Sequence, residues 1–475
     1  MANPHTLALM LVLALCLAAD AVNPGFVVRL TQKGLDYARQ EGMTVLQQRL
    51  SKIHMPDFSG STHVKHLGKV KYSFYRMSVR SFQLPNSQIS FVPGTGLKLT
   101  ISGAFIQVDG TWRVSYHHIS THGGFDLKVE GLSISVGLKL GSDGSGRPTI
   151  APSDCSNHIG DVHVHISGKF GWLADVFRHS IEKDLRNAIE KQICPIVSDS
   201  ITSKLEPLLQ TLPVTAKIDK VAAIDYSLTG PPPVTADFVD VQLKGEFFIF
   251  ANRTTPPFSP PALSLPVDHS LMVYFGVSDY LFNTAGYVYQ SAGKLTFTVT
   301  DDMIPKDFSI RLNTSSFGTL VPQISKMYPN MLMKLVISSV SAPYLTIKPG
   351  NVTISPVMDL KAYAILPNSS LASLFDLKLT TTAVVKIGVT SGRIVGTLDL
   401  SRVQMELIAS DVGPFSVALL NVAVNYYISH IVLPQVNAIL TKGYPLPLLD
   451  HVQLTDVVLQ QSQDFLLFGA NVHYN

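Results

Sequence analysis

The first half of the chain alternates apolar and polar residues in long runs that are typical of β-strands. The segments "KVKYSFYRMSV" (69–79), "GLKLTISGAFIQVDG" (96–110) and "GGFDLKVEGLSISVGLKLG" (123–141) each predict a strand. In the last of them the apolar positions change from odd to even numbers at Gly131, which predicts a β-bulge. Helices are expected over 31–53 and 171–194. The apolar stripe of the first helix consists of Leu35, Ala38, Gly42, Val45, Leu46, Leu50 and Ile53.

The stretch "DGTWRVSYHHISTHGG" (109–124) predicts a β-hairpin of unusual polar composition. A three-residue loop over 109–111 gives one consistent apolar face, whereas a two-residue loop would pair apolar with polar residues. The apolar pairs would be Ala104 with Tyr116, Ile106 with Val114, and Val108 with Trp112. The opposite face of the second strand would then carry Arg113, Ser115 and His117 toward water or a polar partner.

The second half uses the same kinds of element without repeating the sequence. Strand patterns occupy 350–366, 375–389 and 392–408, and helix candidates occupy 279–290 and 414–440. Long antiparallel strands with one long helix at each end of the set predict an α+β fold. Apolar residues make up 46% of the chain and charged residues only 15%. This apolar content exceeds what a soluble protein of this size needs to form its own core. Either the protein assembles, or it buries something apolar that is not protein.

Proline-rich segments at 229–237 and 253–266 divide the chain and flank a strand-like segment at 238–250. The opening "MANPHTLALMLVLALCLAADA" (1–21) has an apolar core followed by small residues, the pattern of a secretory leader. The expected organisation is a leader over 1–21, an N-terminal domain over 22–228, a linker region over 229–266 and a C-terminal domain over 267–475.

Cys16 belongs to the leader, so Cys155 and Cys194 are the only cysteine pair of the mature chain. In an oxidising compartment they predict a disulfide, which would stabilise the fold by roughly 4 kcal/mol through the entropy of the unfolded chain. Asn-x-Ser/Thr sequons also suit a secreted protein and are possible sites of N-glycosylation. All four lie in the second half, at Asn252, Asn313, Asn351 and Asn368.

Charge is distributed unevenly along the chain. Residues 22–217 contain 22 lysine and arginine residues against 15 acidic ones, whereas residues 218–475 contain 15 against 18. Ten of the fifteen histidines also lie within 22–217, so acidification would increase the contrast. The first half should therefore favour anionic partners.

The most concentrated basic segment, 63–76, interleaves lysine and arginine with aromatic residues. Such a strand suits either nucleic acid or the phosphates of an anionic lipid head group. For a secreted chain we favour the lipid and expect no nucleic acid, with an ordinary solvated strand face as the remaining alternative. Its cationic residues are Lys65, Lys69, Lys71 and Arg76.

Catalytic motifs are missing from the sequence. It contains no G-x-S-x-G, no H-E-x-x-H, no Walker A and no G-x-G-x-x-G after a strand, so we expect no enzyme. His163 and His165 project from one strand face and could begin a metal site. Because no further ligands can be placed, two surface histidines are the favoured interpretation, and no metal or other cofactor is expected.

Several segments between Val22 and the end of the chain form a recognisable set, among them "KHLGK", "FQLPNSQISFVPG", "VYFGVSDYLFNTAGYVYQ" and "FLLFGANVHY". They resemble the family of bactericidal/permeability-increasing protein and lipopolysaccharide-binding protein, and the likeness runs from Val22 almost to Asn475. It implies a boomerang of two α+β domains joined by a central sheet, each domain a curved antiparallel β-barrel wrapped on a long helix. It further implies the disulfide Cys155–Cys194 and apolar pockets that hold phospholipid as a structural ligand.

The same resemblance implies that the basic tip of the N-terminal domain binds the phosphates of lipid A. Lys65 and Lys69 match basic positions of the family, Arg113 stands where the family has lysine, and Lys71 adds charge beside them. His63 replaces another lysine. Further uncharged or weakly charged residues stand where one or both family proteins carry arginine or lysine, namely Thr111, Ser115, Tyr116 and His117.

The function implied is that of a secreted innate-immune protein that binds lipopolysaccharide of Gram-negative bacteria. It would be antibacterial, or would neutralise or present endotoxin. The expected partners are lipopolysaccharide, phospholipids, the bacterial outer membrane and a host endotoxin receptor. The protein is expected to be a monomer that is secreted or stored in granules. The alternative is a carrier that shuttles phospholipid between particles. Because ordinary histidines gain charge as the pH falls through about 6.5, binding should strengthen on acidification through His63 and His117.

Overall fold

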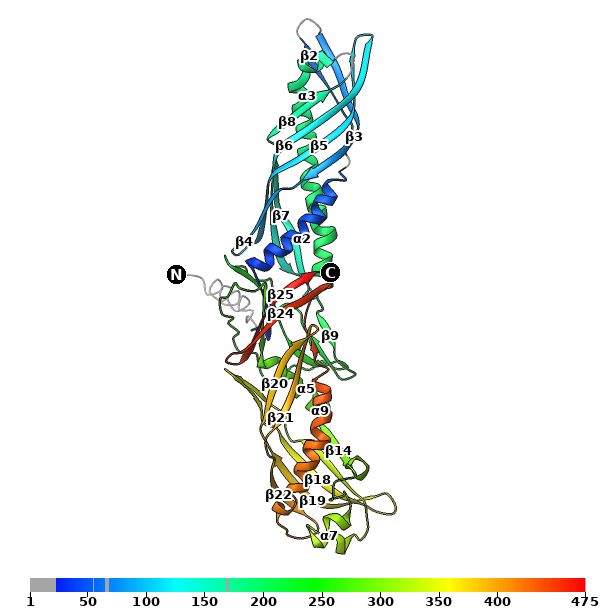
Figure 1. Ribbon diagram of the computed structural model, residues 1–475, viewed down its shortest axis with the longest axis vertical. Helices are drawn as coiled ribbons and strands as arrows, with labels where there is room; N and C mark the ends of the chain where they lie inside the picture. The colour runs from blue at the N-terminus through cyan, green and yellow to red at the C-terminus, as the bar shows by residue number, and fades with distance from the viewer. Residues whose placement is uncertain (1–22, 54, 65–67, 168–170, 475) are drawn as a thin grey trace, which may run out of the picture.

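The computed structural model describes residues 23–53, 55–64, 68–167 and 171–474. The molecule is elongated, with an N-terminal lobe at one end, a C-terminal lobe at the other and a sheet at the waist between them (Figure 1). The predicted leader (1–21) and Lys65 lie outside the described residues. No helix within these ranges combines the length and the apolar character needed to span a bilayer.

The N-terminal lobe is a curved antiparallel sheet that packs on two helices (Figure 1). The strand order is β2-β3-β5-β6-β7, with β4 paired to β5 and β8 paired to β6. Helix α2 (Gln32–Leu50) begins after Thr31, whose side chain caps it by accepting a hydrogen bond from the Gly34 N–H, and α3 is Gly171–Ser200. The strands are β2 (Phe58–Val64), β3 (Gly68–Gln83), β4 (Asn86–Val92), β5 (Gly96–Tyr116), β6 (Ile119–Ser142), β7 (Pro148–His158) and β8 (Asp161–Ile166).

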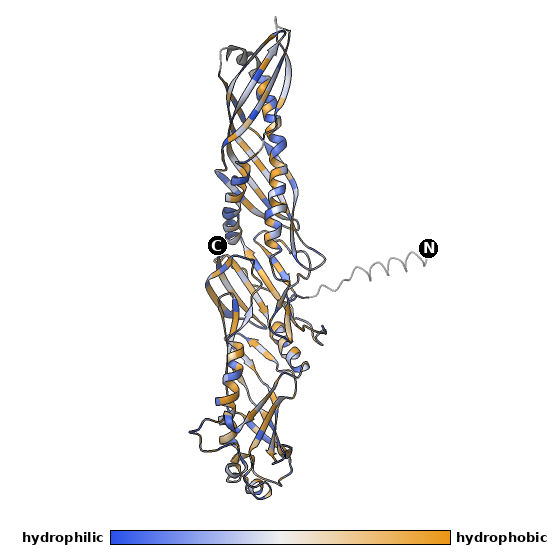
Figure 2. Ribbon diagram, turned by 90° about the vertical axis from the view of Figure 1, so that its right-hand side faces the viewer, coloured by the Kyte–Doolittle hydropathy of each residue, from blue (hydrophilic) through white to orange (hydrophobic). Residues whose placement is uncertain are grey.

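The core of this lobe lies between the helices and the inner face of the sheet. Apolar and polar residues alternate along each strand, as the banding in Figure 2 shows, so one face of the sheet is apolar. The predicted stripe of α2 is buried at Leu35, Leu46 and Leu50, whereas Val45 is 44% exposed. Helix α3 contributes Ile181, Leu185, Ile189, Ile193 and Val197.

The prediction of a hairpin loop at 109–111 is wrong. Strand β5 continues through Asp109 and Gly110, and the chain reverses at His117 and His118, where Tyr116 pairs with Ile119. A strand that continues through 109–111 and a hairpin with a three-residue loop there both place the same residues on the apolar face. The alternation of apolar and polar residues therefore cannot distinguish these two structures. Arg113 was nevertheless correctly assigned to the polar face, since it is exposed, whereas His117 lies in the turn beyond the end of β5.

The bulge predicted at Gly131 is confirmed. The pairing register between β5 and β6 shifts beside it, and Gly131 has a φ of 66°, which favours a residue without a Cβ atom. Gly103 on the facing strand has a similar φ of 68°. These two positions bend the longest strands of the sheet without ending them.

Helix α3 does not end at Cys194 as predicted, but continues through Pro195 to Ser200, followed by one π-helical turn (Ile201–Leu205) and α4 (Glu206–Leu209). Proline removes a backbone N–H and disfavours the helix locally. Ile193 and Val197, on either side of it, are buried against the sheet and hold the helix in place. Tertiary packing thus overrides the local preference.

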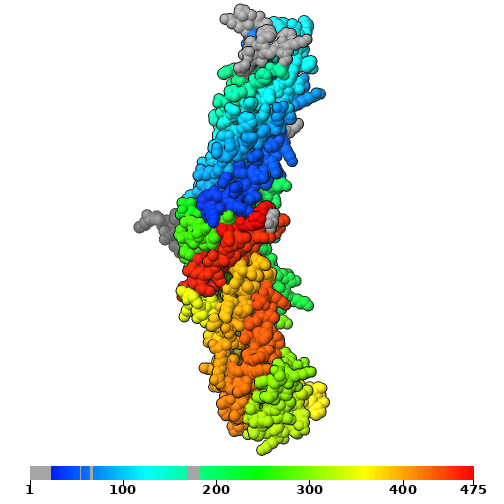
Figure 3. All heavy atoms as spheres, in the orientation of Figure 1, coloured from blue at the N-terminus to red at the C-terminus, as the bar shows by residue number. Residues whose placement is uncertain are grey.

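Strands from distant parts of the sequence form the waist. Its five-stranded sheet has the order β11-β1-β13-β25-β24, and a three-stranded sheet β12-β10-β9 lies beside it. Strands β24 and β25 reach the surface there, in red in Figure 3. The strands are β1 (Phe26–Thr31), β9 (Thr215–Lys217), β10 (Ala222–Asp225), β11 (Phe238–Leu243), β12 (Glu246–Ile249), β13 (Val273–Ser278), β24 (Val452–Gln461) and β25 (Phe465–Tyr474).

A buried arginine connects the strands of the waist. Arg29 of β1 forms a two-pronged ion pair with Asp240 of β11, with nitrogen–oxygen distances of 2.7 and 2.8 Å. Its remaining nitrogen donates to the carbonyl oxygens of Leu265 and Pro266, and the ring of Phe238 lies 3.5 Å from the guanidinium carbon. The proline-rich segment is thereby fixed to the central sheet, although its sequence suggests only a connector.

The C-terminal lobe contains two five-stranded sheets, with the orders β14-β15-β18-β19-β22 and β16-β17-β20-β21-β23. Each strand pattern predicted in the second half is divided between the two sheets at a short interruption. The strands are β14 (Thr296–Thr300), β15 (Met333–Ser339), β16 (Leu345–Lys348), β17 (Asn351–Ile354), β18 (Val357–Ile365), β19 (Leu371–Thr380), β20 (Ala383–Thr390), β21 (Arg393–Leu400), β22 (Gln404–Ser410) and β23 (Tyr444–Pro445).

The helices of this lobe agree with the sequence patterns except at their ends. Helix α5 (Asp279–Ser291) is capped by Ser278, and the helix predicted over 414–440 begins only at Asn421. It runs as α8 (Asn421–Tyr427), a π-helical turn (Ile428–Val432) and α9 (Leu433–Leu440), with the short α6 (Thr314–Phe317) and α7 (Pro322–Met327) elsewhere in the lobe. The α+β class is confirmed. Within the described residues the sheets are open paths, so the expected barrels are not closed.

Candidate functional site

Two hairpins form the free end of the N-terminal lobe, one between β2 and β3 and one between β5 and β6 (Figure 1). Residues directly opposite each other in paired strands point to the same face. His63 pairs with Lys69, Lys71 pairs with Ser115, and Arg113 pairs with His122. We call the exposed set His63, Lys69, Lys71, Arg113 and His122 the tip surface.

Positive charge dominates the tip surface. The described segments that form it, 59–63, 69–73, 113–115 and 120–122, contain no aspartate or glutamate. Lys69 and Lys71 are two residues apart on one strand, which separates them by about 7 Å. The site can therefore offer several cationic donors to a multiply charged anion, and such charge-assisted hydrogen bonds are stronger than neutral ones.

An aromatic layer supports this surface from below. Phe74 of β3 stacks on Phe58 of β2 with ring centroids 5.0 Å apart and meets the edge of Phe125 of β6 at the same distance. The indole nitrogen of Trp112 donates to the carbonyl oxygens of Gly124 and Ser167 at 3.1 and 3.2 Å. The residues that alternate with the cations thus form a packed layer that holds the strands in register.

A hydrogen bond between Tyr72 and Asp184 connects this layer to helix α3. Burial, together with the hydrogen bond to Asp184, raises the pKa of Tyr72 well above its usual value, so the phenol remains a donor. Gly60 faces Tyr72 across the pair of strands, and a Cβ atom there would overlap the tyrosine hydroxyl. Glycine at position 60 is therefore needed for Tyr72 to reach the helix.

The structure brings together most of the residues predicted for the site. Lys69, Lys71, Arg113 and His63 share the tip surface, and Lys65 lies outside the described residues. His117 instead occupies the β5–β6 turn with a φ of 46°, and its ring meets the edge of Tyr116 at 4.4 Å. It extends the site at its outer end rather than contributing to the face of the sheet.

The sequence pattern did not identify Ile119 as a residue of this site. This residue follows the turn and is 65% exposed, beside the charged surface. A large apolar side chain at such a place is suited to contact acyl chains or a lipid surface. The missed signal was the position of the turn, because an isoleucine within a strand would be expected to face the core.

His163 and His165 lie on the exposed face of β8 as expected. They pair with Lys128 and Asp126 of β6. Among the described residues, no group of three or more histidine, cysteine, aspartate or glutamate side chains could hold a metal ion.

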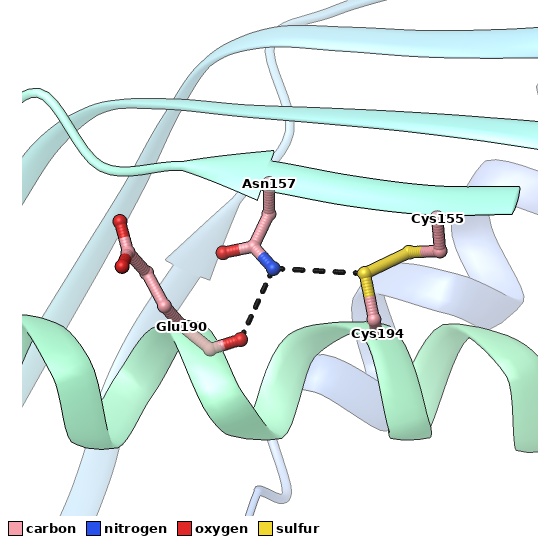
Figure 4. Close-up of a disulfide and its surroundings, with 4 residues drawn as sticks. All are labelled: Cys155, Asn157, Glu190 and Cys194. Carbon is pink, nitrogen blue, oxygen red and sulfur yellow. Dashed lines mark hydrogen bonds between the residues drawn. A yellow bond between two sulfur atoms is a disulfide. The ribbon is translucent and has the colours of Figure 1, made fainter.

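The predicted disulfide is present between Cys155 of β7 and Cys194 of α3 (Figure 4). Beside it the Asn157 amide donates to the Glu190 carbonyl oxygen at 3.0 Å, and the Glu190 carboxylate accepts from the Ile159 N–H at 3.1 Å. Together these contacts fix the long helix to an outer strand of the sheet. These contacts position α3 against β7 and do not involve residues of the tip surface.

The four sequon asparagines have different surroundings. Asn252, Asn351 and Asn368 are exposed, whereas Asn313 is half-buried. The side-chain amide oxygen of Asn313 (Oδ1) caps α6 by accepting from the Ser316 N–H at 2.7 Å. Attachment of a glycan to the amide nitrogen would leave that oxygen free to accept, so the cap does not conflict with modification. Their glycosylation remains a prediction.

Comparison with known families matches both halves of the chain. Residues 34–208 match the N-terminal domain of the LBP / BPI / CETP family, and residues 216–474 match its C-terminal domain. The chain belongs to the LBP / BPI / CETP family. The resemblance seen in the sequence is therefore confirmed.

Individual members of the family are similar over nearly their whole length. The chain is 46% identical to the lipopolysaccharide-binding protein of Bos taurus over 456 residues, covering 96% of this chain and 95% of that protein. It is 42% identical to the bactericidal permeability-increasing protein of Rattus norvegicus over 469 residues, covering 98% and 97%. A crystal structure of lipopolysaccharide binding protein superposes with a TM-score of 0.66 at 44% identity, covering 95% of this chain and all of that one.

Proposed function

We propose that this protein is a secreted innate-immune protein that binds the lipid A part of lipopolysaccharide and makes or breaks no bond. The observation that carries the proposal is the tip surface, where Lys69, Lys71 and Arg113 share one exposed face with no carboxylate in the same strand segments. Membership of a family whose relatives include lipopolysaccharide-binding proteins supports it. Lys65, His63 and His117 are proposed to add to the site.

The two parts of lipid A would be bound by different physical means. Each charge-assisted hydrogen bond from the tip surface to a phosphate contributes about 1.5–3 kcal/mol. Burial of an acyl chain contributes about 0.8 kcal/mol per methylene, so long chains supply much of the affinity and the cations supply selectivity. Ile119 stands where it would meet the first methylenes beside the phosphates.

The apolar interior is proposed to accept phospholipid acyl chains as well. The inner faces of α3 and the sheet are lined by aliphatic side chains, among them Ile181, Leu185 and Ile189, whose chemistry suits hydrocarbon. The same proposal includes the bacterial outer membrane surface and a host endotoxin receptor as partners of a monomer, found outside the cell or in granules. It includes antibacterial activity, or the neutralisation or presentation of endotoxin.

Binding of fluorescent lipid A to the full chain tests the proposal. We expect saturable binding at low micromolar concentration or below, and a loss of about tenfold or more in the K71Q/R113Q double variant. K98Q is the matched control, because Lys98 is an exposed lysine near the opposite end of the strand that carries Arg113. Absence of saturable binding, or equal losses in both variants, would contradict the proposal.

A phospholipid carrier without endotoxin selectivity is the second candidate, favoured by the high apolar content of the chain. It predicts that transfer of phosphatidylcholine between vesicles is undiminished in K71Q/R113Q. Transfer activity without any effect of the double variant on lipid A binding would support this candidate over the first.

A further inference from the structure

An open hollow of about 410 Å³ lies on the outer face of the N-terminal lobe, between the tip surface and the middle of the sheet. Strands β3, β5 and β6 and the end of β8 line it. Its polar lining includes Arg76, Arg80, Thr111, Asp126, His165 and Ser167. Thr111 is two residues from Arg113 on β5, so the hollow begins about 7 Å from the tip surface.

Gly124, which has no side chain, lines the hollow. Gly124 pairs with Thr111 and faces outward, and its φ lies outside the left-handed region that favours glycine. A Cβ atom at this position would have Ser167 Oγ, at 3.4 Å, as its nearest neighbour, which is an ordinary contact. Ser167 itself is fixed, because its N–H and hydroxyl donate to the Gly124 carbonyl oxygen at 3.0 and 2.9 Å. The backbone would accept a side chain here, yet none fills the space.

Arg76 stands at the edge of this hollow in a special backbone conformation. The register of β3 on β5 shifts between Tyr75 and Ser78, and Arg76 has a φ of 54°. Its N–H donates to the Asp57 carboxylate at 3.1 Å. A bulge of this kind redirects a side chain out of the regular alternation of the strand.

The two arginines of the hollow differ in their partners. Arg80 lies 3.4 Å from Asp109 and 3.7 Å from Asp126, whereas the guanidinium of Arg76 has no carboxylate within 4.0 Å among the described residues. The hollow therefore combines one available cation with carboxylates, hydroxyls and an imidazole. Carboxylates accept hydrogen bonds and hydroxyls both donate and accept, which suits the many hydroxyl groups of a sugar.

We infer that this hollow binds an anionic sugar from the saccharide part of lipopolysaccharide, with Arg76 on its phosphate or carboxylate. The inference rests on the proposed function and adds a second contact region to it. Asp126, Thr111 and Ser167 bind sugar hydroxyl groups. A ligand held at the tip surface by its lipid A would extend its saccharide along the outer face of β3, β5 and β6.

Two variants separate this site from the tip surface. R76Q removes the available cation, and G124V fills the hollow with a side chain that suits a strand. Each is tested for binding to delipidated, phosphorylated core oligosaccharide and to lipid A that carries no core sugars. K98Q again serves as the control, and circular dichroism checks that each variant is folded.

We expect R76Q to weaken oligosaccharide binding about tenfold, the lower end of what one charge-assisted hydrogen bond contributes. We expect G124V to weaken it as well, by occupying the space of the ligand, and both variants to change lipid A affinity less than twofold. No binding of oligosaccharide to the unaltered chain, or equal losses for both ligands, overturns the inference. Displacement of the oligosaccharide by an equal concentration of inorganic phosphate also overturns it, because a sugar site must recognise more than the anion. Should the unaltered chain bind the oligosaccharide but not lipid A, the proposed function fails and this inference stands.

Discussion

The N-terminal lobe keeps its longest strands whole, whereas the C-terminal lobe divides comparable segments between two sheets. β5 and β6 contain 21 and 24 residues and bend at Gly103 and Gly131. In the C-terminal lobe the segment 351–365 is interrupted at Ser355 and Pro356, so that β17 and β18 join different sheets. Bulges bend a strand without ending it, so β5 and β6 continue to the tip, where Arg113 of β5 shares one surface with Lys69 and Lys71 of β3.

The lobes also expose different chemistry. Among the described residues the N-terminal lobe exposes few large apolar side chains, with Ile119 at the tip. The C-terminal lobe exposes many more, namely Met327, Leu332, Val340, Tyr344, Leu371, Val384, Ile408, Leu419, Val422 and Ile439. Three of the four sequons lie there too, and Asn313 forms a β-bridge with Leu332. The N-terminal lobe thus presents a cationic surface at its tip, whereas the C-terminal lobe presents apolar side chains.

Removal of the disulfide should produce the largest difference between the lobes. The C155A/C194A variant is expected to lose about 4 kcal/mol of stability in the N-terminal lobe, because the unfolded chain gains freedom. Both tryptophans, Trp112 and Trp172, belong to this lobe, so tryptophan fluorescence during urea unfolding reports on it. Hydrogen exchange in the C-terminal lobe is the internal control. An unchanged tryptophan transition would show that the helix is fixed to the sheet without the bond.

Alkaline pH should destabilise the fold where the C-terminal lobe meets the waist. Burial, with a smaller contribution from Asp219, raises the pKa of Tyr444 to about 12 from its usual 10.0. The folded state therefore favours the neutral phenol, and this stabilisation is complete below pH 10 and is lost as the pH rises toward 12. It amounts to on the order of 3 kcal/mol.

Stability measured from pH 9 to 12 in the unaltered chain and in Y444F tests this expectation. The variant should show a weaker decline above pH 10, since it has no phenol to ionise at this position. Identical pH profiles would mean that Tyr444 ionises equally easily in the folded and unfolded chain.

Loss of the hydrogen bond between Tyr72 and Asp184 should lower the stability of the protein more than loss of the hydroxyl group of a tyrosine in the other lobe. Y72F is expected to cost about 2 kcal/mol, the range for a hydrogen bond to a charged group. Tyr363 of β18 is half-buried and has no side-chain hydrogen bond among the described residues, so Y363F should change stability by less than about 0.5 kcal/mol. Equal effects in chemical denaturation would remove Tyr72 as a specific link between the tip and α3.

The smallest expected effect is the response of lipid A binding to acid. His63, His117 and His122 stand among the cations at the tip, and added charge there should strengthen binding severalfold between pH 7.5 and 5.5, since exposed charges contribute about 0.2–1 kcal/mol each. The H63Q/H117Q variant should show less of this increase in a titration at constant ionic strength. A flat affinity in the unaltered chain would leave the lysines and Arg113 to act without the histidines.

Much of the fold was predictable because it depends on local patterns. The period of two identified β5 and β6, the parity change identified the bulge at Gly131, and the cysteines left one possible pair. The reversal at His117 was not predictable in this way. Either loop placement leaves the apolar face intact, and the choice is made by pairing of β5 with β3 and β6 along its full length.

The sequence by itself determined which residues of the strands face inward, which half of the chain is basic, and which family the protein resembles. Only the tertiary structure decided the register that pairs Lys71 with Ser115 beside Arg113, the projection of Ile119 from the end of this surface, and the hollow that Gly124 and Arg76 line. The physical reason is that side-chain alternation is a property of one strand, whereas register and bulges depend on the partners with which that strand pairs.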